Sequence, residues 1–275
     1  MKSKNFLTSY NSLKEFESYL NTANPSTLFA GHRLDSESTS QSKWYGTATY
    51  QEANDLLKFG DMKNAKKLNA VGKIDTPQMG IAKQRRPQNS VVGFIPNVAN
   101  YLCGNPNNMI NFHNVPMKKK VVTIIYCLSV GCEAKVNEIT NTSKNLINAI
   151  LGIEASGKRV NLLLTCGLCN KEKNDKAESC SILLKIKDSG SIFDKAKMAY
   201  PLINPSFFRR HFFKAVECQE GLTDQVFISH MGWVMAKSDI INVLNENHVE
   251  YDKAITFYEI KGKTPQQIED ILKSN

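Results

Sequence analysis

The sequence predicts an α/β fold with a doubly wound, mostly parallel sheet and a helical, basic N-terminal region. Three consecutive segments predict it: an apolar run at 121–128, a helical pattern at 138–155 and a second apolar run at 159–165. A strand, an amphipathic helix and a strand in this order imply a right-handed crossover between two parallel strands. We expect the 275 residues to divide into a helical and irregular region, 1–117, and an α/β domain, 118–275.

The first strand is predicted by VVTIIYCL at 121–128, an apolar and β-branched run typical of a strand that is buried on both faces. In residues 138–155 the apolar side chains recur three, four or seven positions apart, as one helical face requires. Gly157 follows this helix, where a left-handed cap favours glycine. The chain then enters the second strand at 159–165.

Downstream segments continue the alternation of strands and helices. They are a strand at 181–187, a helix at 191–199, a helix from Asn204 to Cys218, a helix from 238 to 244, a strand at 254–260 and a final helix opened by Thr264. In the helix from Asn204, the spacing places Phe208, Phe212 and Val216 inward and Arg209 and Arg210 outward.

The N-terminal region is predicted to be mainly helical. A first helix is expected around 11–20, before a polar connection rich in Ser and Thr. Thr49 and Glu52 form a capping box that opens a second helix, which Gly60 ends. A basic helix, 61–70, should pair with it as a helical hairpin. Residues 87–116 combine Pro and Gly with apolar residues, a composition that indicates an ordered but irregular segment.

The positive charge is concentrated in one part of the chain. Residues 51–120 hold 11 Lys and Arg against 4 Asp and Glu, which is +7 of the total charge of +9. A clustered basic surface is the electrostatic signature of a polyanion partner, and a solvated surface that keeps the protein soluble is the alternative. The candidate nucleic-acid contacts are Lys58, Lys63, Lys66, Lys67, Lys73, Lys83, Arg85 and Arg86.

Cysteines follow the first two predicted strands. Cys127 and Cys132 come after the first strand, and Cys166, Cys169 and Cys180 come after the second. Because the carboxyl ends of parallel strands meet at one edge of a sheet, these thiols are candidate ligands for zinc. Only one CxxC spacing is present, so buried or merely neighbouring thiols are the alternative to a zinc site.

Two further clusters carry chemically active side chains. Residues 207–213, FFRRHFF, could stack on bases or bind phosphates, and a helix packed on the core is the competing interpretation. Ser229, His230 and His211 could serve nucleophilic or acid-base chemistry. No Gly-x-Ser-x-Gly, His-Glu-x-x-His, phosphate-binding loop or dinucleotide fingerprint accompanies them. The sequence therefore favours a non-enzymatic role.

From roughly Lys118 to the C-terminus, the chain resembles a von Willebrand factor A-like domain. The resemblance lies in the order of a strand, a long helix, a strand and a helix, with IEASGKRVNLLL at the junction of the long helix and the second strand. In such domains Asp-x-Ser-x-Ser follows the first strand and holds a divalent metal through oxygen ligands. The corresponding residues are Cys127-Leu128-Ser129-Val130-Gly131, in which Cys replaces Asp and Gly replaces the last Ser. The resemblance therefore implies the fold without its metal site.

A second resemblance concerns origin. Trp44-x-Gly46-Thr47 with Glu52-Ala53, then Gly93-x-x-Pro96-Asn97-Val98 and Gly104-x-Pro106, resembles a pattern in uncharacterised bacteriophage proteins. It implies a viral protein that acts in the host cytoplasm or in the virion, and it implies no activity.

Composition excludes several classes of protein. No apolar run is long enough to cross a bilayer, and the N-terminus lacks the apolar core of a signal peptide, so we expect a soluble intracellular protein. Seven cysteines, an odd number, favour reduced thiols.

The favoured hypothesis is a phage-type binding and assembly protein that contacts protein partners and nucleic acid. The alternatives are a zinc protein or enzyme at the sheet edge, and a structural homo-oligomeric subunit.

Overall fold

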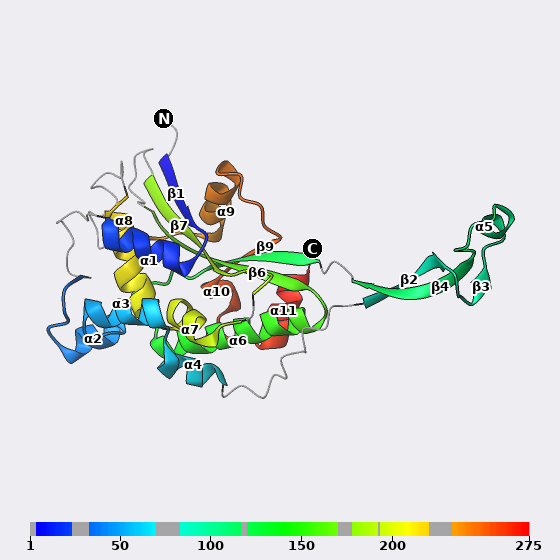
Figure 1. Ribbon diagram of the computed structural model, residues 1–275. Helices are drawn as coiled ribbons and strands as arrows, with labels where there is room; N and C mark the ends of the chain where they lie inside the picture. Colours follow the sequence, from blue (N-terminus) through cyan, green and yellow to red (C-terminus); the bar gives the residue numbers. More distant parts are fainter. Residues whose placement is uncertain are drawn as a thin grey trace. The chain divides into compact units, whose positions relative to one another are not determined.

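A computed structural model of the chain describes residues 4–23, 33–69, 83–116, 120–169, 178–191, 193–219 and 233–274 (Figure 1). The chain forms two compact units. The main unit comprises Met1–Gly72 and Val121–Asn275, and the small sheet unit comprises Lys73–Lys120. This division differs from the expected boundary between residues 117 and 118, because residues before 72 pack with the α/β part of the chain.

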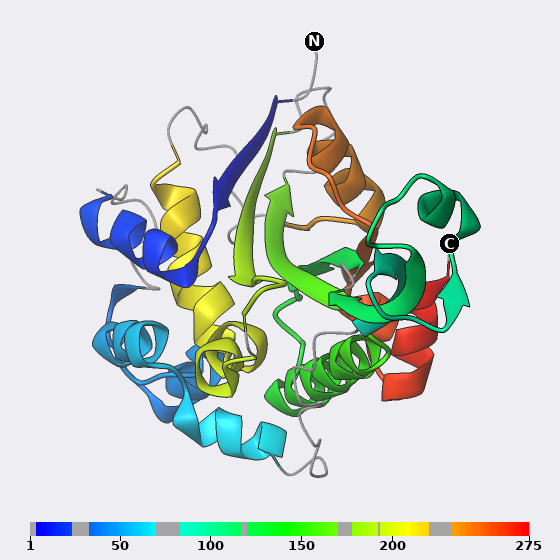
Figure 2. The same cartoon turned by 45° about the vertical axis from the view of Figure 1, so that its right-hand side comes forward.

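The main unit is built on a mixed sheet in the order β1-β7-β6-β5-β9, with the short β8 paired to the end of β6 (Figure 2). Its strands are β1 (Lys4–Tyr10), β5 (Val121–Cys127), β6 (Arg159–Cys169), β7 (Glu178–Lys187), β8 (Trp233–Val234) and β9 (Lys253–Thr256). The pairs β1–β7, β6–β5 and β5–β9 are parallel, whereas β7–β6 and β6–β8 are antiparallel. The expected α/β class is confirmed, and the sheet is mixed but mostly parallel.

The central crossover is confirmed as predicted. β5 and β6 pair in parallel with Ile124 opposite Leu162, and α6 (Val136–Ala155) connects them. Ile124, Ile125 and Tyr126 are fully buried, as an apolar run without alternation requires. Gly157 follows α6 with φ +92, a conformation that residues with a Cβ rarely adopt.

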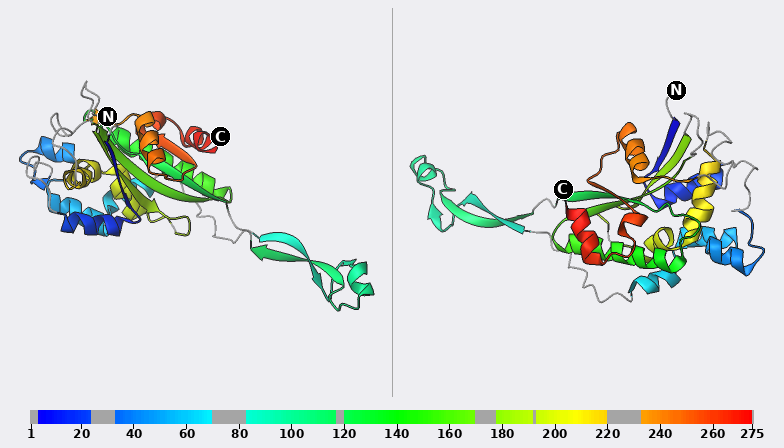
Figure 3. Two further views of the ribbon diagram at one scale, coloured as in Figure 1. Left: turned by 90° about the horizontal axis from the view of Figure 1, so that it is seen from above. Right: turned by 180° about the vertical axis from the view of Figure 1, so that it is seen from behind.

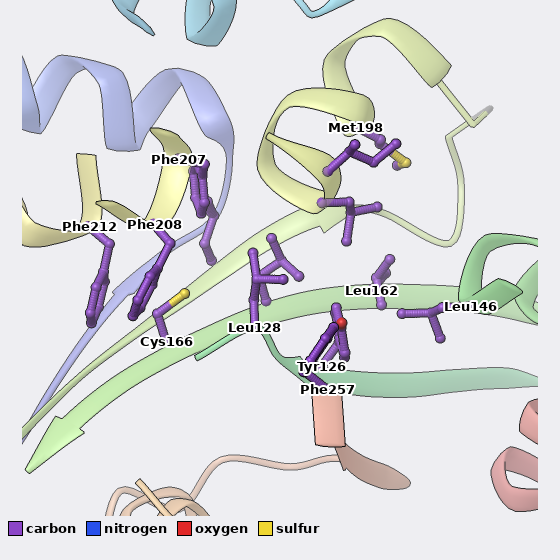
Figure 4. Close-up of a cluster of buried hydrophobic side chains, with 14 of the residues drawn as sticks. Tyr126, Leu128, Leu146, Leu162, Cys166, Met198, Phe207, Phe208, Phe212 and Phe257 are labelled. Atoms are coloured by element: carbon purple, nitrogen blue, oxygen red, sulfur yellow. The ribbon is translucent and has the colours of Figure 1, made fainter. Parts of the chain in front are cut away.

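Helices cover both faces of this sheet (Figures 1 and 3). On one face, side chains of α6, α7 (Lys195–Ile203) and η2 (Phe207–Phe212) pack on the strands in the larger core. Figure 4 shows Phe208, Phe212 and Met198 pointing from their helices toward the sheet. On the other face, α9 (Lys237–Glu246) packs in a smaller core against β5 and β7.

The sheet departs from the prediction at its edges. No strand was predicted for residues 4–10, yet β1 pairs Phe6 with Cys180 and Tyr10 with Leu184. At the other edge the predicted strand 254–260 is only partly correct, because β9 ends at Thr256. There Thr256 and Glu259 form a capping box that opens α10 (Phe257–Ile260).

The remaining helices follow their sequence signals. Thr49 caps α3 by accepting from the Glu52 backbone N–H at 2.9 Å, and Thr264 caps α11 in the same way. The helices not yet bounded are α1 (Leu13–Thr22), α2 (Thr39–Tyr45), α3 (Tyr50–Phe59), α4 (Met62–Asn69), α8 (Phe213–Glu217) and α11 (Pro265–Lys273). α3 and α4 each pack against α7, and over their described residues they do not pack against each other as the expected hairpin would. Within the described residues, no helix is long and apolar enough to cross a membrane.

The small sheet unit contains three antiparallel strands in the order β2-β4-β3. Its elements are β2 (Lys83–Ser90), β3 (Ile95–Pro96), α5 (Val98–Leu102) and β4 (Met109–Pro116). β2 and β4 pair over their whole lengths, from Lys83 opposite Pro116 to Ser90 opposite Met109. The segment that was predicted to be irregular is therefore largely a β-ribbon.

Candidate interaction surface

The predicted basic segment is divided between the two units. Lys58 is near the end of α3, and Lys63, Lys66 and Lys67 are on α4 of the main unit. Lys58, Lys63 and Lys66 are exposed. Because Lys63 and Lys66 are three residues apart on a helix, they share one face of α4.

The other predicted contacts belong to the small sheet unit. Lys83, Arg85 and Arg86 are on β2, where Arg86 is exposed, and Lys73 lies outside the described residues. Residues 73–120 hold 7 Lys and Arg against 1 Asp, a net charge of +6, and residues 83–116 contain no acidic residue. The eight positions are therefore divided between the two units, and +6 of the total net charge of +9 belongs to the smaller unit.

Lys58 also has acidic neighbours. It lines a cleft of about 190 Å³ between α1 and α3, together with Glu17 and Asp55. These carboxylates offset its charge, so Lys58 is a weaker candidate for a phosphate contact than Lys63 or Lys66.

The small sheet unit exposes large apolar side chains, which the sequence analysis did not single out. Phe94 is 78% exposed, Leu102 77% and Val92 72%. The full set is Val91, Val92, Phe94, Ile95, Val98, Tyr101, Leu102 and Phe112. Val98, Tyr101 and Leu102 are three and four residues apart, so they share one face of α5. Exposed apolar residues in such number mark an interaction site more often than an ordinary surface.

This unit has no core of its own among the residues whose burial is described. From 86 to 112 no residue is buried. A small antiparallel ribbon without a buried face is marginally stable in water, so its apolar side chains are not explained by folding of the unit alone.

Local hydrogen bonds nevertheless fix the shape of the unit. Asn97 caps α5 by accepting from the Asn100 backbone N–H at 3.2 Å, and its amide donates to Asn89 Oδ1 at 3.1 Å. Asn100 donates to the Asn107 carbonyl at 3.0 Å. A Cβ at Gly93 would lie 2.3 Å from the Ile110 carbonyl oxygen, so this close approach requires glycine. The apolar side chains are thus presented on an ordered backbone.

The cysteines that were predicted to lie together are found on opposite faces of the sheet. Cys166 and Cys180 belong to the larger core, and Cys127 and Cys169 belong to the smaller core on the opposite face. Cys132 follows β5 and is exposed. Among the described residues, no three His, Cys, Asp or Glu side chains lie close enough to hold a metal ion. The described geometry gives the zinc hypothesis no support.

Burial controls the chemistry of these thiols. Burial raises the pKa of Cys180 to about 12 and raises the pKa of Cys166 well above its usual value. Both thiols are therefore neutral near pH 8, and the thiolate is the nucleophile. The described residues include all seven cysteines, and no disulfide joins any two of them.

Alkylation should separate the cysteines by exposure. At pH 8 in the native protein, we expect iodoacetamide to modify Cys103 and Cys132 quickly and to leave Cys166 and Cys180 unmodified until urea unfolds the chain. Mass spectrometry of tryptic peptides measures each site. Fast native labelling of Cys166 would contradict its buried position.

The aromatic and basic cluster at 207–213 is internal. Phe208, Phe212 and Val216 are buried as predicted, but the prediction that Arg209 and Arg210 face outward is wrong. Arg209 is 3% exposed and Arg210 0%, because the segment 33–48 covers this side of η2 and its carbonyls accept hydrogen bonds from both side chains.

Each arginine binds backbone carbonyls and stacks on an aromatic ring. Arg210 donates to the carbonyls of Leu34 and Thr47, at 2.8 and 3.1 Å, and its guanidinium lies 4.4 Å from the centre of the Tyr45 ring. Arg209 donates to the Trp44 carbonyl at 2.6 Å and stacks on its ring. These contacts engage the terminal nitrogens of both guanidinium groups inside the protein, so the two arginines have a structural role and are not accessible to phosphates.

His211 is part of the same internal network. Its Nδ1 lies 2.7 Å from the Tyr200 hydroxyl, and its Nε2 lies 2.9 Å from Asn54 Oδ1. Burial raises the pKa of Tyr200 well above its usual value, so this hydroxyl keeps its proton. The network joins α3, α7 and η2. Ser229 and His230, the other members of the predicted catalytic set, lie outside the described residues.

The position that corresponds to a von Willebrand-type metal site is occupied by protein contacts. Ser129 Oγ accepts from the Gly167 N–H at 2.8 Å and donates to its carbonyl at 3.1 Å. The neighbouring Gly131 N–H donates to the Tyr258 hydroxyl, which in turn donates to Glu133 at 3.1 Å. Ser129 therefore supports the backbone of β6 at this point.

Comparison with known proteins gives a family but no activity. A search of curated proteins found no match, and a search of solved structures found none either. A family model described as "Domain of unknown function (DUF7192)" matches residues 1–274. The chain therefore belongs to the DUF7192 family of domains of unknown function.

Proposed function

We propose that this chain is a non-enzymatic binding and assembly protein that attaches to protein partners and contacts nucleic acid through basic residues between 58 and 86. The observation that carries the proposal is the composition of the small sheet unit, which combines a net charge of +6 with large exposed apolar side chains. An excess of positive charge attracts polyanions, and exposed apolar groups attract protein surfaces.

The proposal retains the two resemblances stated above. The phage-type pattern includes Gly93, which the fold requires at a close backbone approach, and Asn97, which caps α5. The von Willebrand A-like resemblance is supported by the strand order β7-β6-β5-β9, which follows the beginning of the doubly wound order. A protein of this kind acts in the host cytoplasm or in the virion.

A salt series tests the nucleic-acid contact. Labelled single- and double-stranded DNA and RNA are titrated with the full chain, with Lys63→Gln/Lys66→Gln and with Arg85→Gln/Arg86→Gln. Each double variant should reduce the magnitude of the negative slope of log affinity against log salt by about 2. Each lost phosphate contact reduces that magnitude by roughly 0.7 to 0.9. Separate variants are needed because the two pairs lie on different units.

The matched control is Lys14→Gln/Lys43→Gln, which removes the same charge from exposed positions outside the predicted segment. It should leave the slope nearly unchanged. No binding of any nucleic acid at low salt, or an equal loss in the control, would end the polyanion part of the proposal.

A further inference from the structure

We infer that the exposed apolar side chains of the small sheet unit form a docking surface for a heterologous protein whose own surface is apolar and carries carboxylates. The inference rests on the proposed function and specifies the partner in its assembly role. The surface is defined by the eight exposed apolar residues from Val91 to Phe112 described above.

The total apolar area that these eight side chains expose is large enough for a protein interface. The side chains have exposed fractions between 46% at Phe112 and 78% at Phe94. Side chains of this size expose on the order of 100 Å² each at such fractions. Together they approach the roughly 800 Å² that each partner contributes to a standard protein interface.

The backbone beneath the surface is already ordered. The Phe94 N–H donates to the Ile110 carbonyl at 2.9 Å, and the Asn97 N–H donates to the Asn108 carbonyl at 2.7 Å. With the side-chain bonds of Asn97 and Asn100, these contacts hold the segment 91–108 in one shape. A preorganised surface binds with a smaller entropic cost than a segment that folds on binding.

The charge of the small sheet unit indicates the chemistry of its partner. Residues 83–116 contain three basic residues and no acidic residue. A partner surface that carries carboxylates near its apolar centre would be attracted to this positive charge and would gain both affinity and rate of association. A second copy of this chain fits less well, because two units of net charge +6 would repel each other.

The side chains themselves disfavour nucleic acid and lipid as the occupant of this surface. Five of the eight residues are Val, Ile or Leu, which lack the planar rings that stack on bases. Irregular backbone with exposed polar groups does not enter the hydrocarbon of a bilayer, because those groups would lose their hydrogen-bond partners. A protein surface can supply both apolar contact and hydrogen bonds.

Site-specific photo-cross-linking in the cells that make this chain tests the inference. A benzophenone side chain replaces Phe94 or Leu102 in the full chain, and a control replaces Tyr258, which is 48% exposed on the main unit. We expect positions 94 and 102, but not 258, to form an adduct with one heterologous protein. The cross-linked peptide should contain apolar residues together with Asp or Glu.

The dissociation constant between the purified partner and the full chain is then measured. Phe94→Ser/Leu102→Ser should raise Kd by about a hundredfold, because central apolar anchors dominate such interfaces. Reversal of the charge of the partner's carboxylates should weaken binding further. An adduct with a second copy, a nuclease-sensitive adduct, a lipid adduct or no adduct would overturn the inference.

The same Ser variant separates this result from the nucleic-acid proposal. It keeps every charge, so its salt slope for nucleic acid should equal that of the unchanged chain. If this variant keeps the salt slope for nucleic acid, and photo-cross-linking yields no protein adduct, only the docking surface is refuted. A smaller salt slope in the Lys63/Lys66 or Arg85/Arg86 variant tests the nucleic-acid contact and does not depend on the docking surface.

Discussion

Replacement of Arg210 with alanine is expected to lower the free energy of unfolding by about 4 kcal/mol. The guanidinium donates to the carbonyls of Leu34, Thr47 and Ala48 and to the Ser36 hydroxyl, and it is completely buried. The substitution removes these charge-assisted bonds and leaves the carbonyls without their donor, while it also opens a cavity beside Tyr45. Urea unfolding monitored by circular dichroism measures the change.

Two further variants define the cause of this loss. Arg210→Lys should remain strongly destabilised, because an ammonium cannot donate along the fixed directions of the guanidinium fork. Lys66→Ala, at an exposed position, should change stability by no more than about 0.5 kcal/mol. A loss below about 1 kcal/mol for Arg210→Ala would show that the segment 33–48 does not depend on this side chain.

Strand, helix and strand between 121 and 169 could be predicted because their signals are local. The apolar run of β5 and the regular spacing of α6 are each long enough to identify one type of element. The capping residues Thr49 and Thr264 act on N–H groups three positions away, so their effect can also be inferred from sequence.

β1 and the orientation of Arg210 depend on distant residues. β1 is short and polar in part, and its parallel partner β7 begins more than 170 positions later. Helical periodicity placed Arg210 on the side away from the core, but it could not show that the segment 33–48 covers that side. The carbonyls that accept from Arg210 lie more than 160 positions earlier in the chain.

Of the candidate interaction surface, only the excess of positive charge could be predicted from the sequence. The excess of Lys and Arg is visible in the sequence, but their division between α4 and β2 is not. The β2–β4 ribbon lacks the alternation of apolar and polar residues because neither of its faces is buried where burial is described. The composition of residues 87–116 indicated an ordered segment, but it did not indicate that apolar residues such as Phe94 and Leu102 are exposed.

Removal of the small sheet unit should weaken nucleic-acid binding strongly without unfolding the rest of the chain. A Gly-Ser linker of about twenty residues would replace residues 73–120, which removes 7 Lys and Arg and 1 Asp. Because the main unit has its own sheet and cores, its thermal midpoint should change by less than about 3 °C. Circular dichroism melting provides this control.

The most direct test of the account is the salt-dependent affinity of this deletion variant for labelled duplex DNA and RNA, beside that of the full chain. We expect the affinity at low salt to fall by at least about tenfold and the magnitude of the salt slope to fall by about 3, because four of the eight proposed phosphate contacts lie in the removed unit. A folded variant that retains the full affinity and slope would contradict the assignment of binding to the small sheet unit.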